Sequence, residues 1–339
     1  MRSGNFVGFS RKRHQTKHLV SSPTCFASRG SGVRAPHVHQ NFPECKGLTK
    51  SLISKPAFVR VGFHQVIAPQ RNCFILPGAA SMHRIQWIEI HEQPWFPSSL
   101  RDEITDALYF GLSLLKAYAP IAPLLQEALD FTGSQSIVDM CSGGGGPWSD
   151  LSRRIQGDGH PFRIWLTDKY PNLTASQNFT SSANHCSVYP DAVDAMNVPH
   201  ELKGFRTIFT SFHHFSPVEA QVILQNAVDA RQGIGVFEIT RRAPFTIGLM
   251  FLWALLPFVC TPFIRPFRLS RLFWTYVVPV IPLVLLFDGV VSCLRTYRPQ
   301  ELQQIIEELN TTAYRWQIGE QCGGIGRLTI TYSIGCPKT

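Results

Sequence analysis

The order of apolar and polar residues along the chain predicts helices first and then short buried strands. From Ser99 to Leu115 apolar residues recur at the spacing of one helix face, and Ser99 with Asp102 fits a capping box. A second helix is predicted over residues 121–131. Short runs rich in β-branched and aromatic residues follow, and they predict strands at 136–140, 163–167, 187–193, 206–211 and 235–240.

The rest of the core continues this alternation. A helix over 217–231 separates the last two of these strands, and a helix over 299–310 precedes two further strands near 315–320 and 327–334. Strands that alternate with helices predict an α/β fold with a doubly wound, mostly parallel, seven-stranded sheet. A closing hairpin would leave one antiparallel strand in it.

A long apolar stretch interrupts the pattern after the fifth strand. Residues 243–264 and 272–287 carry no charge, and a basic run lies between them. We therefore expect a first part of the core, an apolar insert that contacts a membrane or covers the site, and a C-terminal part of the core. These parts span residues 82–242, 243–288 and 289–339.

The first 81 residues differ in composition from the rest. They hold twelve Lys or Arg residues and one acidic residue, Glu44, with no sustained period. Three interpretations stay open: an organellar targeting segment, a basic arm that contacts anionic lipid, and a non-native extension before Met82. Without this stretch the chain has a slight acidic excess, so we expect no nucleic-acid partner.

The string IVDMCSGGGGPWSDL, residues 137–151, carries the clearest binding signal. A strand ends near Asp139, a glycine-rich turn follows, and helical sequence resumes. Glycines let the backbone approach a ligand closely, and the next helix offers free N–H groups at its start. A dinucleotide-binding G-x-G-x-x-G motif fits less well, because Trp148 or Ser149 stands in the place of its third glycine.

The same string resembles motif I of the class I S-adenosylmethionine-dependent methyltransferases, in which an acidic residue precedes three alternating glycines. Asp139 takes the acidic place, Cys141 departs from the first glycine, and Gly143 and Gly145 supply the other two. The resemblance implies the Rossmann-like fold of that family. It also implies that these four residues contribute to binding S-adenosylmethionine as the cofactor.

The resemblance assigns roles to residues that follow the later strands. Asp168 would bind the two ribose hydroxyls of the cofactor. Asp194 would meet the adenine amino group, with Ala195 packing nearby. Phe212 falls in the substrate-facing motif at the end of the fourth strand and is grouped with the cofactor-binding residues.

His213 and His214 are the candidate catalytic residues, because neutral imidazole accepts protons near pH 7. Consecutive residues on a strand point to opposite faces, so we expect at most one ring to face the methyl group. The alternative is that one ring binds the backbone while the other packs. Glu238 is a weaker catalytic candidate, and its alternative role is to anchor the loop that leads into the insert. The nine cysteines include no C-x-x-C pair, and we expect no metal site.

The apolar insert predicts contact with a membrane. As a helix, its first segment would be about 33 Å long, against a bilayer core of about 30 Å. Prolines break both segments, and a full span would place Arg265, Arg268 and Arg271 on the far side. A shallow hairpin that keeps these arginines near the headgroups is therefore favoured over a full span or a buried lid.

The resemblance implies methyl transfer, and the insert favours a small acceptor that is lipophilic or resides in the membrane, with the catalytic domain on the cytoplasmic side. The resemblance covers about residues 100–240 and 290–335. Residues 287–302, FDGVVSCLRTYRPQEL, also resemble a segment in a group of these methyltransferases that carry an apolar insert. A nicotinamide-dependent oxidoreductase and a non-catalytic membrane protein with a methyltransferase-like fold are the alternatives.

Overall fold

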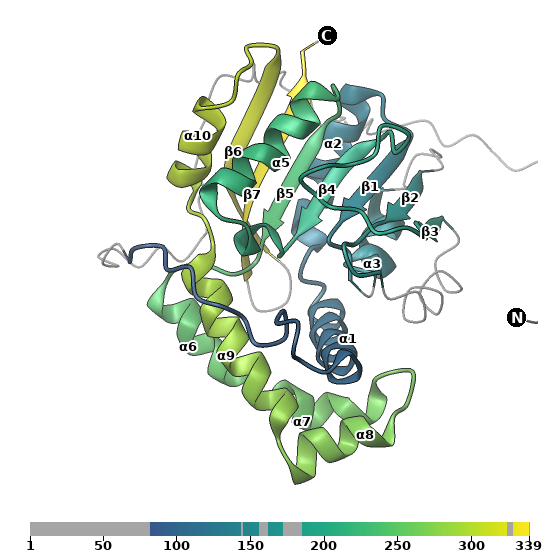
Figure 1. The fold of residues 1–339 in the computed structure, drawn as a ribbon, viewed down its shortest axis with the longest axis vertical. Coiled ribbons are helices and arrows are strands. Elements are labelled where there is room, and N and C mark those ends of the chain that lie inside the picture. The colour runs from purple at the N-terminus through teal and green to yellow at the C-terminus, as the bar shows by residue number, and fades with distance from the viewer. Residues whose placement is uncertain (1–81, 144, 156–161, 172–184, 324–327, 339) are drawn as a thin grey trace, which may run out of the picture. The chain divides into compact units, whose positions relative to one another are not determined.

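The protein is described by a computed structural model, which covers residues 82–143, 145–155, 162–171, 185–323 and 328–338 (Figure 1). The expectations for the tail, residues 1–81, lie outside the described residues.

Seven strands form one sheet in the order β3-β2-β1-β4-β5-β7-β6 (Figure 1). Strands β1 to β5 are parallel to one another, and β7 runs antiparallel to both of its neighbours. The predicted doubly wound sheet with one antiparallel strand is thereby confirmed. The strands span Ser136–Met140 (β1), Arg163–Leu166 (β2), Cys186–Val188 (β3), Phe205–Phe209 (β4), Ile234–Glu238 (β5), Tyr314–Gly323 (β6) and Leu328–Pro337 (β7).

Helices cover both faces of this sheet, because alternate strand residues point to opposite sides. Ile137 and Phe237 pack in one apolar layer with α2 and α3, and Val138 and Val236 pack in the other with α5 and α10. The core helices span Ser98–Leu114 (α1), Ala122–Thr132 (α2), Trp148–Ile155 (α3), Pro217–Asp229 (α5) and Pro299–Glu307 (α10), with a short helix at Ala119–Ile121 (η1).

The capping box expected at Ser99 and Asp102 is wrong. Helix α1 begins one residue earlier, its N-cap is Pro97, and no side chain caps it. A complete capping box occurs instead at the start of α5, where Ser216 and Glu219 satisfy each other's backbone N–H groups.

The apolar insert is helical and lies at the carboxyl end of the parallel strands (Figure 1). Helix α6 packs on α9, and α1 contacts both α7 and α9. Helix α9 continues seven residues past the expected boundary at 288, so its last two turns belong to the core side. The elements are Pro244–Trp253 (α6), Leu256–Cys260 (α7), Thr261–Phe263 (η3), Leu269–Leu272 (α8), Phe273–Val277 (η4) and Val280–Arg295 (α9).

By length and composition, one stretch of the described chain could cross a membrane. This is Pro244–Phe263, whose mean hydropathy is 1.8. Two bent helix pairs meet the same criterion if each pair is counted as one span, namely Ser98–Leu114 with Ala119–Thr132 and Leu269–Val277 with Val280–Arg295. In the first of these pairs α2 packs in the core layer and α1 packs mainly against the insert, so apolar length alone does not identify a span here.

The three arginines of the insert do not act alike. Arg271 is buried, forms an ion pair with Asp106 of α1, and donates a hydrogen bond to the carbonyl of Pro266. The expectation that Arg271 lies near lipid headgroups is therefore wrong, since this side chain pins the insert to α1. Arg265 is exposed and Arg268 is half-buried, so these two stay open to solvent or headgroups.

Residues 82–97 form an irregular segment, which we call the strap, across α9 and the end of β4. The Ile85 amide donates to the carbonyl of Leu294 at 3.1 Å. Arg84 donates to the carbonyls of Arg295 and His213, and its guanidinium lies 4.1 Å from the ring centre of Tyr297. No sequence periodicity predicted this segment, because its order comes from contacts far along the chain.

Candidate active site

The glycine-rich loop after β1 has a left-handed backbone at several positions. The φ angles are 52° at Gly143, 123° at Gly145 and 58° at Gly146. Cys141 also has a positive φ, of 56°, although it carries a side chain. The position where Cys141 departs from the glycine pattern therefore keeps the conformation that a glycine would adopt most readily, at a cost in strain.

Asp139, near the end of β1, contacts the glycine-rich loop from its buried side. It is 1% exposed, and one carboxylate oxygen accepts a hydrogen bond from Thr207 Oγ1 at 2.7 Å. A side chain at Gly146 would come within 3.2 Å of its other oxygen. Burial raises the pKa of Asp139 to about 7. Asp139 thus shapes the loop from inside the core and presents almost no surface to a ligand.

Asp168 lies at the end of β2 and joins the loop directly. Its two carboxylate oxygens accept hydrogen bonds from the backbone N–H groups of Gly143 and Tyr170, both at 2.9 Å. Burial raises the pKa of Asp168, although these N–H groups act in the opposite direction. The sequence placed Asp168 beside the glycine loop, and the structure adds a direct contact between them.

Asp194 and Ala195 lie in the turn that follows β3. One carboxylate oxygen of Asp194 accepts from the Met196 amide at 2.9 Å, and the other lies 3.0 Å from Lys169 Nζ. Although burial opposes it, these donors hold the pKa of Asp194 below its usual value. Asp194 is half-buried and carries a charge, whereas Ala195 is buried in the core layer beside it.

Phe212, His213 and His214 form one short helical turn, η2, at the end of β4. The expectation that the two imidazole rings point to opposite faces is wrong, because the strand ends at Phe209 and Thr210 has a φ of 42°. The rings of His213 and His214 lie 4.3 Å apart between centres. Phe212 is fully buried against Tyr297, so it offers no open face to a cofactor.

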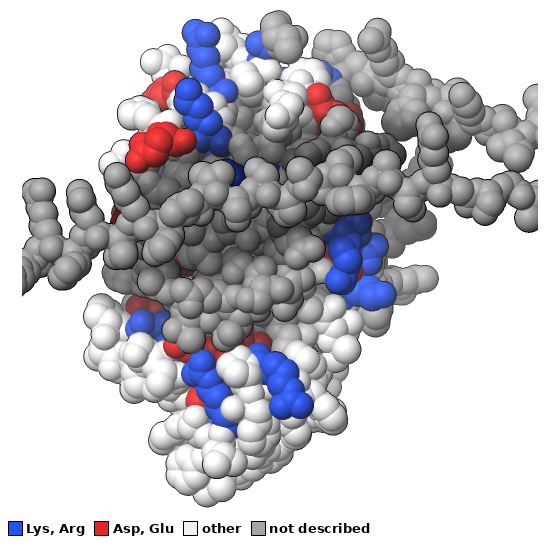
Figure 2. Space-filling model, turned by 90° about the vertical axis from the view of Figure 1, so that its right-hand side faces the viewer, with Lys and Arg blue, Asp and Glu red and all other residues white. Residues whose placement is uncertain are grey.

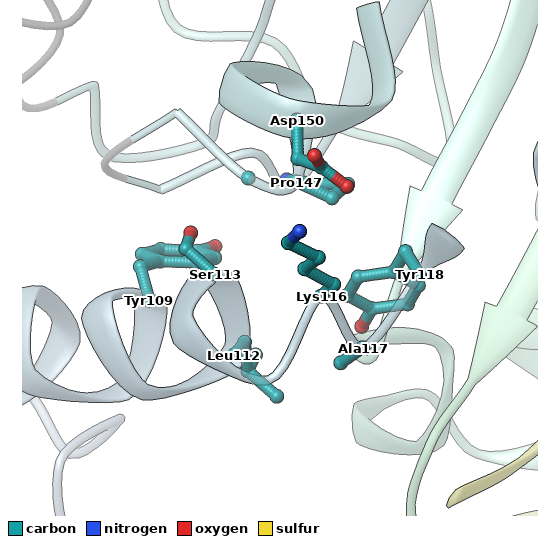
Figure 3. Close-up of a pocket in the computed structure, with 9 residues that line it drawn as sticks. Tyr109, Leu112, Ser113, Lys116, Ala117, Tyr118, Pro147 and Asp150 are labelled. Carbon is teal, nitrogen blue, oxygen red and sulfur yellow. The ribbon is translucent and has the colours of Figure 1, made fainter. Parts of the chain in front are cut away.

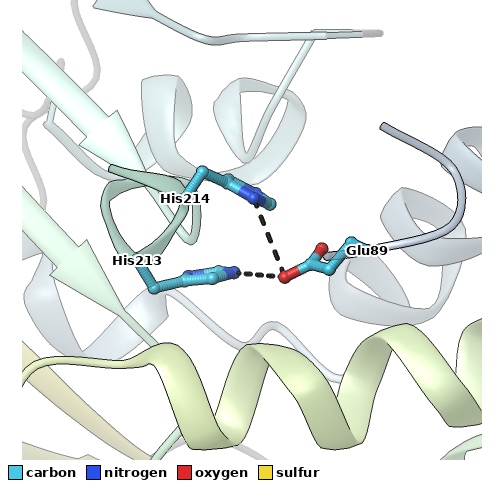
Figure 4. A group of neighbouring side chains, drawn as sticks. All are labelled: Glu89, His213 and His214. Carbon is cyan, nitrogen blue, oxygen red and sulfur yellow. Dashed lines mark ion pairs between the residues drawn. The ribbon is translucent and has the colours of Figure 1, made fainter. Parts of the chain in front are cut away.

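His213 is buried between two carboxylates. Its Nδ1 lies 2.8 Å from Glu238 Oε2, and its Nε2 lies 3.4 Å from Glu89 Oε1 (Figure 4). Burial disfavours the charged ring, but Glu238 and Glu89 raise the pKa of His213 to about 10. Glu238 accepts a hydrogen bond from Thr240 Oγ1 in the loop into the insert, at 3.4 Å, and it also binds η2 through this ring and two backbone N–H groups.

His214 is the more exposed of the two rings. Its Nδ1 lies 2.5 Å from Glu92 Oε1 and 3.7 Å from Glu89 Oε1. Arg295, near the end of α9, forms ion pairs with both glutamates and donates hydrogen bonds to the carbonyls of His213 and His214. The strap thus brings two carboxylates to the histidine pair, and α9 supplies the cation that holds them.

Sequence reasoning missed Glu89, Glu92 and Arg295. The string EIHE at residues 89–92 carried a signal, because three ionisable residues stand in a short stretch otherwise rich in Trp and Ile. The segment from residue 287 to 297, noted only for its resemblance, carries both Asp288 and Arg295. Asp288 accepts hydrogen bonds from the Ile90 amide and the His91 ring.

The loop and the histidine pair lie within electrostatic reach of each other. The pKa of Asp168 is raised by burial first, and the charge on His214 acts against that rise. Similarly, burial raises the pKa of the Cys141 thiol, and Glu92 adds to the effect. The candidate cofactor residues follow β1, β2 and β3 and the candidate catalytic residues follow β4, so all of them lie at the carboxyl edge of the parallel strands, where ligands bind in open α/β sheets.

A small pocket opens beside the end of the loop (Figure 3). Tyr109 of α1, Lys116 and Tyr118 line one side, and Pro147 and Asp150 line the other. Tyr109 also donates a hydrogen bond from its hydroxyl to the carbonyl of Ser142. This pocket includes neither Asp168 nor Asp194, so it is a neighbour of the predicted cofactor position.

Replacing Cys141 should separate backbone strain from side-chain effects. We expect Cys141→Gly to raise the free energy of unfolding by about 1 kcal/mol, because glycine adopts a positive φ without steric cost. Cys141→Ala is the control, since it removes the thiol and keeps the strain. Chemical denaturation measures both, and equal stabilities for the two variants would contradict the strain at Cys141.

The buried Asp139 predicts a pH dependence of stability. Between its ordinary pKa of 3.8 and its folded value of about 7, the folded state keeps a proton that the unfolded state has lost. Stability should therefore fall as pH rises through this window, by up to about 1.4 kcal/mol per pH unit from this group, and level off above it. Chemical denaturation at several pH values should show that Asp139→Asn lacks this fall in stability, whereas Asp191→Asn, at an exposed residue, should retain it. Identical pH profiles for wild type and Asp139→Asn would refute the assignment.

No family model matches the chain, and no curated protein matches it in sequence. Among solved structures, it is similar to the plantazolicin methyltransferase BpumL in complex with SAH, at 10% identity and a TM-score of 0.48, over 72% of this chain and 93% of that one. It is also similar to the mitomycin 7-O-methyltransferase MmcR, at 16% identity and a TM-score of 0.42, over 71% of this chain and 58% of that one. A third similar structure is human N-acetylserotonin methyltransferase in complex with SAM, at 12% identity and a TM-score of 0.40, over 70% of this chain and 57% of that one.

TM-scores below 0.5 at such identities bear on neither the activity nor the substrate of this chain. The fold rests on its own topology instead. The strand order, the single antiparallel strand β7 and the glycine-rich loop after β1 agree with the expectation drawn from the sequence. On this topology, the chain has the Rossmann-like fold of the class I methyltransferases.

Proposed function

We propose that the protein transfers a methyl group from S-adenosylmethionine to a small lipophilic acceptor at a membrane surface. The observation that carries the proposal is the contact between Asp168 and the amide of Gly143 at 2.9 Å. It brings an acidic residue after β2 onto the glycine loop after β1, at the edge where ligands bind in open α/β sheets.

The donor end of the site consists of the loop and two acidic residues. Asp168 has oxygens suited to a ribose diol, whose hydroxyls would replace or share the backbone donors that it now holds. Asp194 is half-buried, and its carboxylate would accept a hydrogen bond from the adenine amino group. Charge-assisted hydrogen bonds of this kind contribute about 1.5–3 kcal/mol each.

The acceptor end is placed at the half-exposed His214. Methyl transfer breaks the bond from the methyl carbon to the sulfonium sulfur and forms a bond to the acceptor atom. S-adenosylhomocysteine leaves, together with the proton of the acceptor. His213 is buried and bound to Glu238, so the proton would leave on the side of the half-buried His214. Alignment and exclusion of water would supply most of the rate.

We place the proposed membrane contact on the insert. Its helices expose large apolar side chains, and α6 has no buried residue. Figure 2 shows the corresponding lowest part of the molecule free of charged side chains in that view. So much exposed apolar surface is unusual for a monomer in water and typical of a membrane or protein interface. The most exposed of these side chains are Phe245, Leu252, Val259, Phe263, Leu269 and Val277.

This placement favours the shallow contact over a buried lid or a full span. Arg271 ties the insert to α1, and the exposed Arg265 can reach anionic headgroups from the same loop. The catalytic domain would then stay on the cytoplasmic side, with its site next to the bilayer. A lipophilic acceptor would reach His214 without exposing its hydrocarbon to water, which costs about 0.8 kcal/mol per CH₂.

Replacing Asp168 tests the donor site. We expect Asp168→Asn to weaken binding of S-adenosylmethionine at least about tenfold, because the amide lacks the charge and one of the two acceptor oxygens. The exposed Asp191→Asn is the matched control and should bind as wild type does. Isothermal titration measures both, and unchanged affinity in Asp168→Asn would contradict the proposed ribose contact.

Flotation with liposomes tests the membrane surface. Leu252 and Val259 are 65% and 68% exposed, so charges there should not disturb the fold. We expect Leu252→Glu with Val259→Glu to abolish flotation with vesicles that contain anionic lipid. The control is Val218→Glu on α5, a site that is 71% exposed and lies outside the insert. If the double variant floats like wild type, the insert does not dock on lipid.

A further inference from the structure

Three potential metal ligands converge at the end of β4. They are Glu89 from the strap and the two rings of η2, His213 and His214 (Figure 4). One ligand atom from each lies within 4.8 Å of the other two. Glu89 and His213 are each 1% exposed, whereas His214 is half-buried and borders the acceptor end of the site.

Of the ring atoms that face Glu89, the buried His213 Nε2 has no hydrogen-bond partner, whereas His214 Nδ1 lies 2.5 Å from Glu92 Oε1. His213 Nε2 lies 3.4 Å from Glu89 Oε1, which is too long for a normal N–H···O hydrogen bond. The buried His213 Nε2 thus faces Glu89 without a partner, while Glu89 Oε1 accepts a hydrogen bond from Ser292 Oγ at 3.0 Å and His214 is paired with Glu92.

The charges around this point are unbalanced. Glu89, Glu92 and Glu238 all contact the histidine pair. Among the described residues, Arg295 is the guanidinium that pairs with these carboxylates. With both imidazoles neutral, as metal binding requires, the three carboxylates and Arg295 leave an excess of two negative charges. One divalent cation bound by neutral imidazoles would offset that excess.

The separations fit such an ion. Metal–ligand bonds of about 2.0–2.1 Å in a tetrahedron place ligand atoms about 3.4 Å apart. Glu89 Oε1 lies 3.4 Å from His213 Nε2 and 3.7 Å from His214 Nδ1. Two imidazole nitrogens with one carboxylate oxygen suit zinc or iron(II) better than magnesium or calcium.

The surroundings of His213 match a metal-binding histidine. Such a ring usually donates its second N–H to a carboxylate, which fixes its orientation and its tautomer. His213 Nδ1 lies 2.8 Å from Glu238 Oε2, and Glu238 is itself held by the Phe212 amide at 2.7 Å. His213 Nε2 is therefore aimed at Glu89 by a fixed support.

We propose that Glu89, His213 and His214 bind one divalent transition-metal ion of the zinc or iron(II) class. Three protein ligands leave at least one coordination position on the side of His214, next to Glu92. Resting on the proposed function, an acceptor oxygen bound there would be acidified by the ion before methyl transfer.

Metal content tests the site without reference to activity. The full chain, purified in detergent without chelators, should contain about one equivalent of zinc or iron by plasma mass spectrometry. After removal of the metal, titration with Co²⁺ should give visible absorption bands that saturate at one equivalent. The isosteric Glu89→Gln and the half-exposed His214→Gln should each weaken Co²⁺ binding at least tenfold. His185→Gln, at an exposed histidine, should not change it.

The alternative occupant is a proton on His213, with the cluster held by ion pairs alone. Wild-type protein that binds S-adenosylmethionine but holds less than 0.1 equivalent of metal, and gives no Co²⁺ bands, would overturn the metal site and leave the proposed function standing. Wild-type protein that holds the metal but does not bind S-adenosylmethionine would overturn the proposed function and leave the metal site standing. If Glu89→Gln fails to fold, the wild-type titration and His214→Gln decide the question.

Discussion

The site depends on one buried carboxylate, that of Glu238 at the end of β5. It accepts hydrogen bonds from the backbone N–H groups of Phe212 and His213 at the start of η2, and it also binds the ring of His213. An unpaired carboxylate in the core is strongly disfavoured, so the chain after β4 must turn toward it. That turn presents His213 and His214 on one side, where the strap and α9 can meet them.

The insert and the core are one structure at this point. Helix α9 begins among the exposed apolar side chains of the insert and ends at Arg295, which binds the glutamates of the strap and the carbonyls of η2. At about 1.5 Å per residue, its 16 residues place the two ends about 24 Å apart. A single helix therefore connects the proposed lipid contact to the histidine pair.

The sequence predicted the sheet well because its signals are local. Buried strands such as β4 and β5 are short runs of apolar residues, and the glycine loop follows β1 in an unbroken string. It also placed Asp168 and Asp194 near the loop, because the carboxyl ends of parallel strands share one edge. Boundaries were less certain: the third strand ends at Val188, well before the predicted residue 193.

The histidine cluster could not be predicted in the same way. Its acidic residues lie in the strap, which has no period of its own, and the orientation of His213 depends on a turn at Thr210 that strand alternation does not reveal. Arg271 illustrates the same limit, because a basic residue in an apolar stretch indicates a headgroup contact until its partner Asp106 is known. The positions and contacts of these residues depend on partners that are distant in the sequence.

The strap also constrains the order in which the protein can form. Glu89 and Arg295 are separated by 206 residues, and Ile90 by 198 residues from Asp288, which accepts its N–H. Contacts between such distant segments form late, since the chain between them must first be closed into a loop. During synthesis, the carboxylates of the strap thus stay in water until α9 has left the ribosome. The parallel sheet can assemble around β1 and β4 before then, so the binding site is completed after the scaffold that carries it.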